Sequence, residues 1–150
     1  MSEQFDPLKP DEQLGHLIVR AAEVISKPWL LGLREHGINP RQFSVLSILA
    51  ADERLSQADL ARRTNITPQS MGELLGGLER SELVSRREQV PGLPTRIAVT
   101  EKGEAVLTAA YPVVQRLHEE SIAALDPRER EVLAMLLHRL IASGTDESAT

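Results

Sequence analysis

The apolar residues of this chain recur at helical spacing through most of its length, in segments separated by turn residues. The first stripe begins near Asp11 and continues through Trp29 to Leu33, so it predicts a long N-terminal helix. Pro28 lies within this stripe, and a proline inside a helix removes a backbone hydrogen bond. We therefore expect the helix to kink or split at about that residue. Gly37 is expected to end it, as the left-handed residue beyond the C-cap.

Each of the five later predicted helices is preceded by a residue whose side chain can accept hydrogen bonds from the first free backbone N–H groups. Proline follows the cap directly in three of them, and its fixed φ suits the first helical position. The last helix is expected to end at Gly144. The predicted caps are Asn39, Ser56, Thr67, Thr100 and Asp126.

Between the fourth and fifth helices the pattern becomes strand-like. Residues 83–87 and 96–99 are short β-prone segments, and a Pro-Gly-Leu-Pro turn at 91–94 separates them. This is the single hairpin that the sequence predicts. The expected fold is therefore mainly α, with six helices and one β-hairpin.

Composition excludes several classes of function. The 150 residues include no cysteine, which rules out disulfides, thiol catalysis and zinc sites built on cysteine. No apolar run approaches the length of a membrane span, and no secretory signal is visible, so we expect a cytoplasmic protein. No two of the four histidines lie one helical turn apart, and no nucleophile with an adjacent base is evident. We therefore predict no metal, no cofactor and no enzymatic activity.

The segment after the second helix has the spacing of a helix-turn-helix. Two helices that cross steeply need a small residue at the contact, a residue that tolerates the left-handed region in the turn, and apolar anchors. A plain helical hairpin is the alternative explanation of the same pattern. The matching positions are Ala61 at the contact, Asn65 in the turn, and Leu60, Ile66, Met71 and Leu74 as anchors.

Charge is unevenly distributed along the chain. The net charge is −5, yet residues 40–103 carry nine basic and eight acidic residues, so the acidic excess lies near the two ends. Fourteen of the seventeen basic residues are arginine, which suits phosphate and groove contacts better than lysine does. A mixed, solvated surface is the simpler interpretation of charge alone.

These features together resemble the MarR family of transcriptional regulators. The likeness extends from about Asp11 to Ser143 and rests on four runs: Leu60-Ala61-Arg62-Arg63, Thr67-Pro68-Gln69-Ser70, Leu78-Glu79-Arg80 leading to Leu83-Val84-Ser85-Arg86-Arg87, and Thr100-Glu101-Lys102-Gly103. The resemblance implies one MarR-like domain over 1–150, with dimerisation helices at 11–36 and 104–143 and a winged helix-turn-helix lobe at 40–103. It also implies a homodimer that binds a pseudo-palindromic operator in double-stranded DNA and responds to a small-molecule effector, most simply as a repressor.

The sequence departs from the family in two places. Its wing tip is Pro91-Gly92-Leu93-Pro94 instead of an Asp-Arg pair, and its fourth helix carries three glycines and no arginine before Arg80. We therefore expect modest sequence affinity, carried largely by contacts of the wing and of the DNA backbone. Without such contacts the wing arginines would be a solvated edge that prevents aggregation of the hairpin. The predicted DNA-binding residues are Ser56, Gln57, Arg62, Arg63, Thr67, Gln69, Ser70, Glu73, Arg80, Arg86, Arg87 and Arg96.

Two further surfaces are expected. The last helix carries apolar residues on more than one face, which indicates a symmetric partner helix; packing within its own chain is the alternative. Candidates for an effector pocket are Trp29, Leu33, His36 and Phe43, which would otherwise be ordinary core. A winged-helix protein that binds another protein and not DNA stays open as the second function, because the chain is acidic overall.

Overall fold

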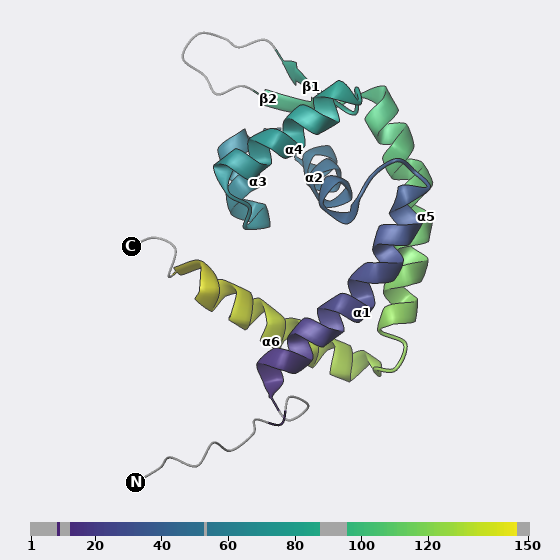
Figure 1. The fold of residues 1–150 in the computed structure, drawn as a ribbon, viewed down its shortest axis with the longest axis vertical. Helices are drawn as coiled ribbons and strands as arrows, with labels where there is room; N and C mark the ends of the chain where they lie inside the picture. Colours follow the sequence, from purple (N-terminus) through teal and green to yellow (C-terminus); the bar gives the residue numbers. More distant parts are fainter. Residues whose placement is uncertain (1–8, 10–12, 53, 88–95, 147–150) are drawn as a thin grey trace.

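The structure is a computed structural model that describes residues 9, 13–52, 54–87 and 96–146. Among these residues, α2, α3, α4 and a β-hairpin form a lobe, α1 packs along α5, and α6 crosses below them (Figure 1). The predicted helices and hairpin are confirmed. The elements are α1 (Leu14–Arg34), α2 (Pro40–Ala51), α3 (Gln57–Thr64), α4 (Pro68–Arg80), β1 (Val84–Arg87), β2 (Arg96–Val99), α5 (Glu101–Ser121) and α6 (Pro127–Asp146).

The five predicted cap residues begin the helices as expected. Three of them form full capping boxes. In a capping box the cap side chain accepts from the backbone N–H three residues on, and the side chain of that residue accepts from the backbone N–H of the cap. At the start of α6, for example, Asp126 Oδ1 accepts from the Glu129 N–H at 2.9 Å, and Glu129 Oε2 accepts from the Asp126 N–H at 2.8 Å. The other two boxes join Asn39 to Gln42 and Ser56 to Asp59.

Three helices end in the same way, on a residue with positive φ. In each case the next N–H donates to a carbonyl five residues back, as in a Schellman motif. Gly37 and Asn65 were expected in this role, whereas Glu82 was not, because a glutamate rarely adopts this conformation. The closing bonds run from Ile38 to Leu33 (3.3 Å, with Gly37 at φ 73°), from Ile66 to Ala61 (3.0 Å, with Asn65 at φ 50°) and from Leu83 to Leu78 (2.9 Å, with Glu82 at φ 61°).

The start of α5 holds Glu82 in that conformation. The Thr100 hydroxyl donates to the Glu82 carbonyl at 2.6 Å, and Lys102 Nζ lies 3.2 Å from Glu82 Oε2. Gly103 packs so closely that a Cβ there would lie 2.2 Å from the Leu83 carbonyl oxygen. The Thr-Glu-Lys-Gly run therefore fixes where α5 leaves the lobe.

The core lies in the lobe and where α1 and α5 adjoin it. Each of the helices α1 to α5 contributes at least one buried side chain, as do both strands. The fully buried residues with the largest side chains are Leu33, Leu46, Leu49, Leu60, Met71, Leu75, Leu78, Ile97 and Val45. This shared core sets the position of α4 relative to the long helices.

The expected split of α1 at Pro28 and the expected end of α6 at Gly144 are wrong, while a kink at Pro28 stays a prediction. Helix α1 runs unbroken through Pro28, so the proline does not split it. Pro28 and Val24 are both exposed, so water can reach the carbonyl of Val24, which the proline leaves without its helical donor. Helix α6 continues past Gly144 to Asp146. The wing tip at 91–94 lies outside the described residues.

We predict that Gly103→Ala destabilises the protein. The added methyl would meet the Leu83 carbonyl oxygen and Val99 Cγ1, and overpacking of this kind costs about 1–3 kcal/mol. Gly77→Ala is the control: its Cβ would meet nothing closer than 3.8 Å, and alanine favours a helix by about 1 kcal/mol. Urea unfolding at one fixed protein concentration measures both. Equal stability of the two variants would contradict the proposed close contact.

Candidate nucleic-acid interface

Helix α4 separates an apolar face from a polar one. Met71, Leu75 and Leu78 are buried against the lobe. On the other side Gln69 and Glu73 are exposed, and so is Arg80 at the end of the helix. This polar face carries hydrogen-bonding groups suited to the edges of bases in a major groove.

The first turn of α4 is closed by a pair of hydroxyl side chains. Thr67 Oγ1 accepts from the Ser70 N–H at 3.2 Å and donates to Ser70 Oγ at 3.0 Å. Both residues are exposed. The N-terminus of α4 is therefore ordered and open to solvent, where its partial positive charge can meet an anion.

Helix α3 is tied to α4 through Gln57. Its Nε2 donates to the Pro68 carbonyl at 3.3 Å, so the amide lies over the first turn of α4. The left-handed turn at Asn65 and the buried pair Leu60 and Ala61 hold the two helices at this contact. The structure thus brings together the predicted residues of α3 and α4 on adjoining surfaces.

The two arginines of α3 have different surroundings. Arg62 pairs with Asp59 one turn earlier on the same helix. Arg63 instead lines a cleft of about 340 Å³ between α2 and the α3–α4 turn. Arg41, on α2, lines the same cleft. It could not be selected from the sequence, because its proximity to Arg63 depends on tertiary packing.

The wing arginines also differ. Arg86 Nε donates to Glu79 Oε1 at 2.9 Å, which joins β1 to the last turn of α4. This pairing places Arg86 partly in an internal ion pair, which the sequence could not show because the two residues lie on different elements. Arg96 is exposed on β2 and lies opposite Arg87 in the strand register. Two arginine positions face one another at the outer end of the described hairpin.

The expected effector residues lie at the junction of α1 and α2. Leu33 and Phe43 are buried in the core, while Trp29 and His36 are half-buried. The indole Nε1 of Trp29 is buried and has no hydrogen-bond partner among the described residues. None of these four side chains lines the three clefts of about 340, 410 and 630 Å³ on the described part of the chain. The cleft whose lining residues are nearest in sequence to these four has a volume of about 630 Å³ and includes Lys27, Leu30 and Arg41.

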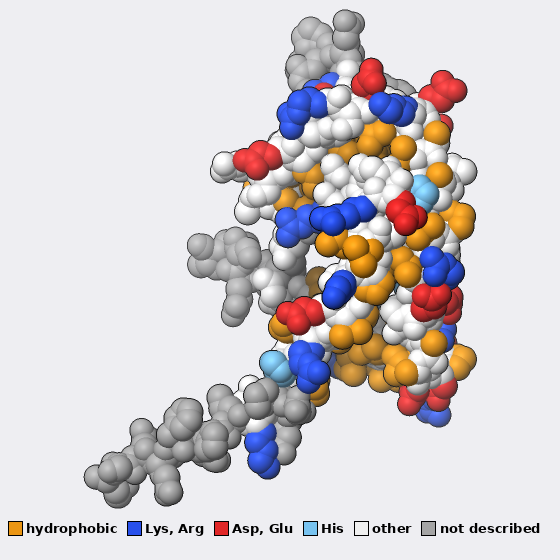
Figure 2. Space-filling model, turned by 45° about the vertical axis from the view of Figure 1, so that its right-hand side comes forward, with side chains coloured by type: hydrophobic (Ala, Val, Ile, Leu, Met, Phe, Trp, Pro, Cys, Tyr) orange, Lys and Arg blue, Asp and Glu red, His pale blue; other side chains and the backbone are white. Residues whose placement is uncertain are grey.

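The long helices expose a large apolar area. Figure 2 shows hydrophobic side chains at the surface over much of the lower half of the molecule, where these helices lie in Figure 1. Leu14 is 69% exposed and Ile141 is 61% exposed. No described side chain of α6 is buried. No helix among the described residues is long and apolar enough to cross a membrane.

Comparison with known proteins identifies the family. Residues 36–92 match a family model described as "MarR family". The HTH-type transcriptional repressor Rv2887 of Mycobacterium tuberculosis is 32% identical over 131 residues, which cover 86% of this chain and 94% of that protein. The HTH-type transcriptional repressor NicR of Pseudomonas putida is 29% identical, with 95% of this chain and 90% of that protein covered.

Solved structures agree with this. The structure of Rv2887 in complex with DNA matches with a TM-score of 0.69 and 28% identity, over 87% of this chain and 98% of that one. The complex of Rv2887 with salicylic acid matches with a TM-score of 0.66 and 29% identity, over 87% and 97%. The fold is a winged helix-turn-helix. The chain belongs to the MarR family of transcriptional regulators, as the resemblance of its motifs implied.

We predict that Asp59 stabilises the protein only while its carboxyl is ionised. The Ser56 hydroxyl and backbone N–H, at 2.6 and 2.9 Å, and the neighbouring Arg62 hold the pKa of Asp59 below its ordinary value. A lowered pKa adds stability above the unfolded value of about 3.9 and loses it as pH falls through the folded value. The parent should therefore be more stable than Asp59→Asn at pH 7, and this difference should vanish in acid.

Urea titrations of both proteins between pH 7 and pH 3 measure that difference. Ser56→Ala is the matched variant: without the hydroxyl, the pKa of Asp59 should rise toward its ordinary value, so the loss of stability in acid should be smaller and should be complete at a higher pH. A difference between parent and Asp59→Asn that is constant with pH would contradict the assignment.

Proposed function

We propose that the protein is a dimeric, ligand-responsive repressor that binds a pseudo-palindromic site in double-stranded DNA. The observation that carries this is α4, whose capped N-terminus and polar outer face stand beside an arginine-bearing hairpin. The relative Rv2887 is a repressor with a structure in complex with DNA, which supports duplex DNA as the partner over another protein. The proposal places the protein in the cytoplasm and assigns it no enzymatic step, in line with relatives that are transcriptional regulators.

The proposed contacts divide into base readers and backbone contacts. The amide of Gln69 matches adenine, and the carboxylate of Glu73 can accept from the cytosine amino group. Ser70 can bond to either a base or a phosphate. Hydroxyl, amide and guanidinium groups around these readers suit phosphates. The other proposed DNA contacts are Ser56, Gln57, Arg62, Arg63, Thr67, Arg80, Arg86, Arg87 and Arg96.

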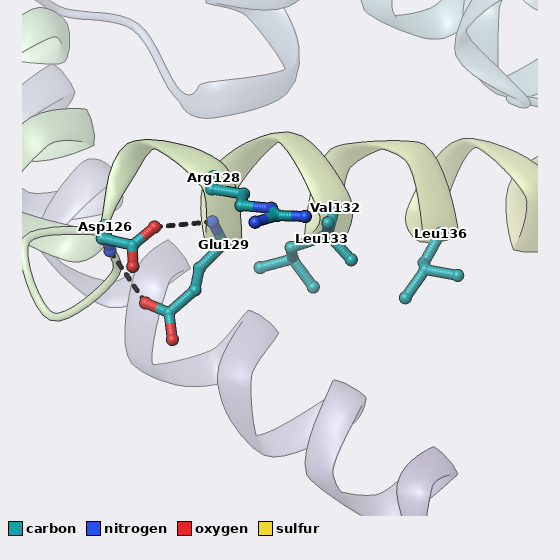
Figure 3. Close-up of a pocket in the computed structure, with 6 residues that line it drawn as sticks. All are labelled: Asp126, Arg128, Glu129, Val132, Leu133 and Leu136. Carbon is teal, nitrogen blue, oxygen red and sulfur yellow. Dashed lines mark hydrogen bonds between the residues drawn. The ribbon is translucent and has the colours of Figure 1, made fainter.

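The apolar surface of the long helices supports a second copy of the chain as partner. Val132, Leu133 and Leu136 line an open pocket of about 410 Å³ beside the capping box of α6, and their side chains lie on one side of the helix (Figure 3). Burying one leucine side chain is worth about 1.5–3 kcal/mol. A helix without a buried side chain therefore gains most of its stability from a partner, and a symmetric dimer also supplies two half-sites.

A small-molecule effector is the third part of the proposal. Rv2887 has a structure in complex with salicylic acid. In this chain Trp29 and His36 lie at the junction of α1 and the lobe, with Leu33 and Phe43 behind them in the core. The unpartnered indole N–H of Trp29 can donate to an acidic ligand there.

We predict that DNA binding weakens steeply with salt and that wing arginines contribute to this dependence. Each phosphate contact adds about 0.9 to the slope of log K against log salt, so Arg96→Ala should lower the slope by about two per dimer. Arg116→Ala is the control, because Arg116 pairs with Glu120 on α5 away from the lobe. Fluorescence anisotropy on a duplex selected from random DNA measures both. A parent that selects no duplex would contradict the proposed function.

We predict that Leu136→Glu separates the dimer. A charge placed on the apolar face of α6 cannot be buried without a partner, and that costs several kcal/mol. His138→Glu adds a charge to the opposite side of the same helix and should leave the mass unchanged. Size-exclusion chromatography with light scattering should give twice 16.6 kDa for the parent and the control. A parent with the mass of one chain would contradict dimerisation.

A further inference from the structure

The recognition helix α4 carries glycine at three positions, Gly72, Gly76 and Gly77. Each glycine costs about 1 kcal/mol of helix stability relative to alanine. None of them has positive φ, so backbone conformation does not require glycine. The helix nevertheless runs without a break from Pro68 to Arg80.

At Gly72 the space is taken by a side chain from α3. A Cβ built there would lie 3.2 Å from Nε2 of Gln57, which is closer than side chains normally approach. The same Nε2 donates to the Pro68 carbonyl. The amide of Gln57 therefore occupies the surface of α4 where a side chain of residue 72 would stand.

At Gly76 and Gly77 the neighbouring side chain comes from the last turn of α4 itself and lies at ordinary van der Waals distance from where a Cβ would stand. A Cβ at Gly76 would lie 3.4 Å from Nη1 of Arg80, and a Cβ at Gly77 would lie 3.8 Å from its Nη2. Helical side chains lean toward the N-terminus, so the guanidinium of Arg80 reaches back by one turn. It thus lies on the outer face that also carries Gln69 and Glu73.

Both groups keep hydrogen-bonding capacity. Gln57 Nε2 uses one N–H on Pro68, which leaves its second N–H and its Oε1 for an adenine edge. Arg80 forms no salt bridge with another described residue. Its guanidinium therefore retains the pair of parallel donors that matches O6 and N7 of guanine.

We propose that Gln57 and Arg80 are specificity-determining residues, and that Gly72 and Gly76, which carry no side chain, leave room for the ends of Gln57 and Arg80 on the face that reads DNA. The recognition surface then consists of Gln57, Gln69, Glu73 and Arg80. Arg80 is its guanine reader, although it lies at the far end of α4 from Gln69 in the sequence. This inference rests on the proposed function, because it requires α4 to lie in a duplex groove.

The test compares the base preferences of variants by selection from random duplex DNA. Gln57→Ala and Arg80→Ala remove the two readers. Gly72→Leu and Gly76→Leu leave both readers in the chain but fill the space that each occupies, and leucine favours the helix over glycine. We expect Gly72→Leu to lose the same adenine preference as Gln57→Ala, and Gly76→Leu to lose the same guanine preference as Arg80→Ala, each by about tenfold for a good bidentate pair.

Arg80→Lys separates base reading from charge. Lysine keeps the positive charge but lacks the planar pair of donors, so we expect the salt slope of the parent with a reduced guanine preference. Helix content by circular dichroism shows whether each variant folds. If the parent selects a sequence but the leucine variants select the same one, this inference is wrong and the proposed function stands. If the parent selects no sequence, the proposed function itself has failed.

Discussion

The crossing of α3 and α4 is the constraint on which the rest of the structure depends. Leu60 and Ala61 are buried at the crossing, and Asn65 turns the chain in the left-handed conformation between the two helices. A larger residue at position 61 would separate the helices, and a β-branched residue at 65 would strain the turn. Because of this crossing, the polar face of α4 stays open while its apolar face completes the core. Gln57 can reach across from α3 for the same reason.

The helices α1 and α4 end in the same way as α3, on a residue with positive φ. Gly37, Asn65 and Glu82 all adopt positive φ, and each end is closed by a bond back to a residue one turn or more earlier. Glu82 is held by Thr100 and Lys102 from the start of α5. The direction of the long helix is therefore coupled to the end of the recognition helix. A change in the long helices has a physical route to α4, as a ligand-responsive regulator needs.

Much of this fold could be predicted from the sequence because its signals are local. Caps such as Asn39 and Asp126, and the turn at Asn65, depend on residues within one or two turns of each other. The predictions that failed or were incomplete concern features that depend on solvent exposure or on contacts between elements far apart in the sequence. Pro28 does not break α1 because its face is exposed, and Arg86 pairs with Glu79 across two elements. The proposed role of the glycines in α4 could not be predicted from the sequence either, because it depends on where the side-chain ends of Gln57 and Arg80 lie.

The absence of cysteine permits a direct measurement of the docking of α4. Gln69→Cys can carry a single DNA-cleaving iron–EDTA group, with Arg116→Cys as the control on α5. On a duplex selected by the parent, cleavage from position 69 should fall within two inverted half-sites about one helical turn apart, and the control should give little. Cleavage that is uniform along the duplex, or equal from both positions, would contradict the placement of α4 in a groove.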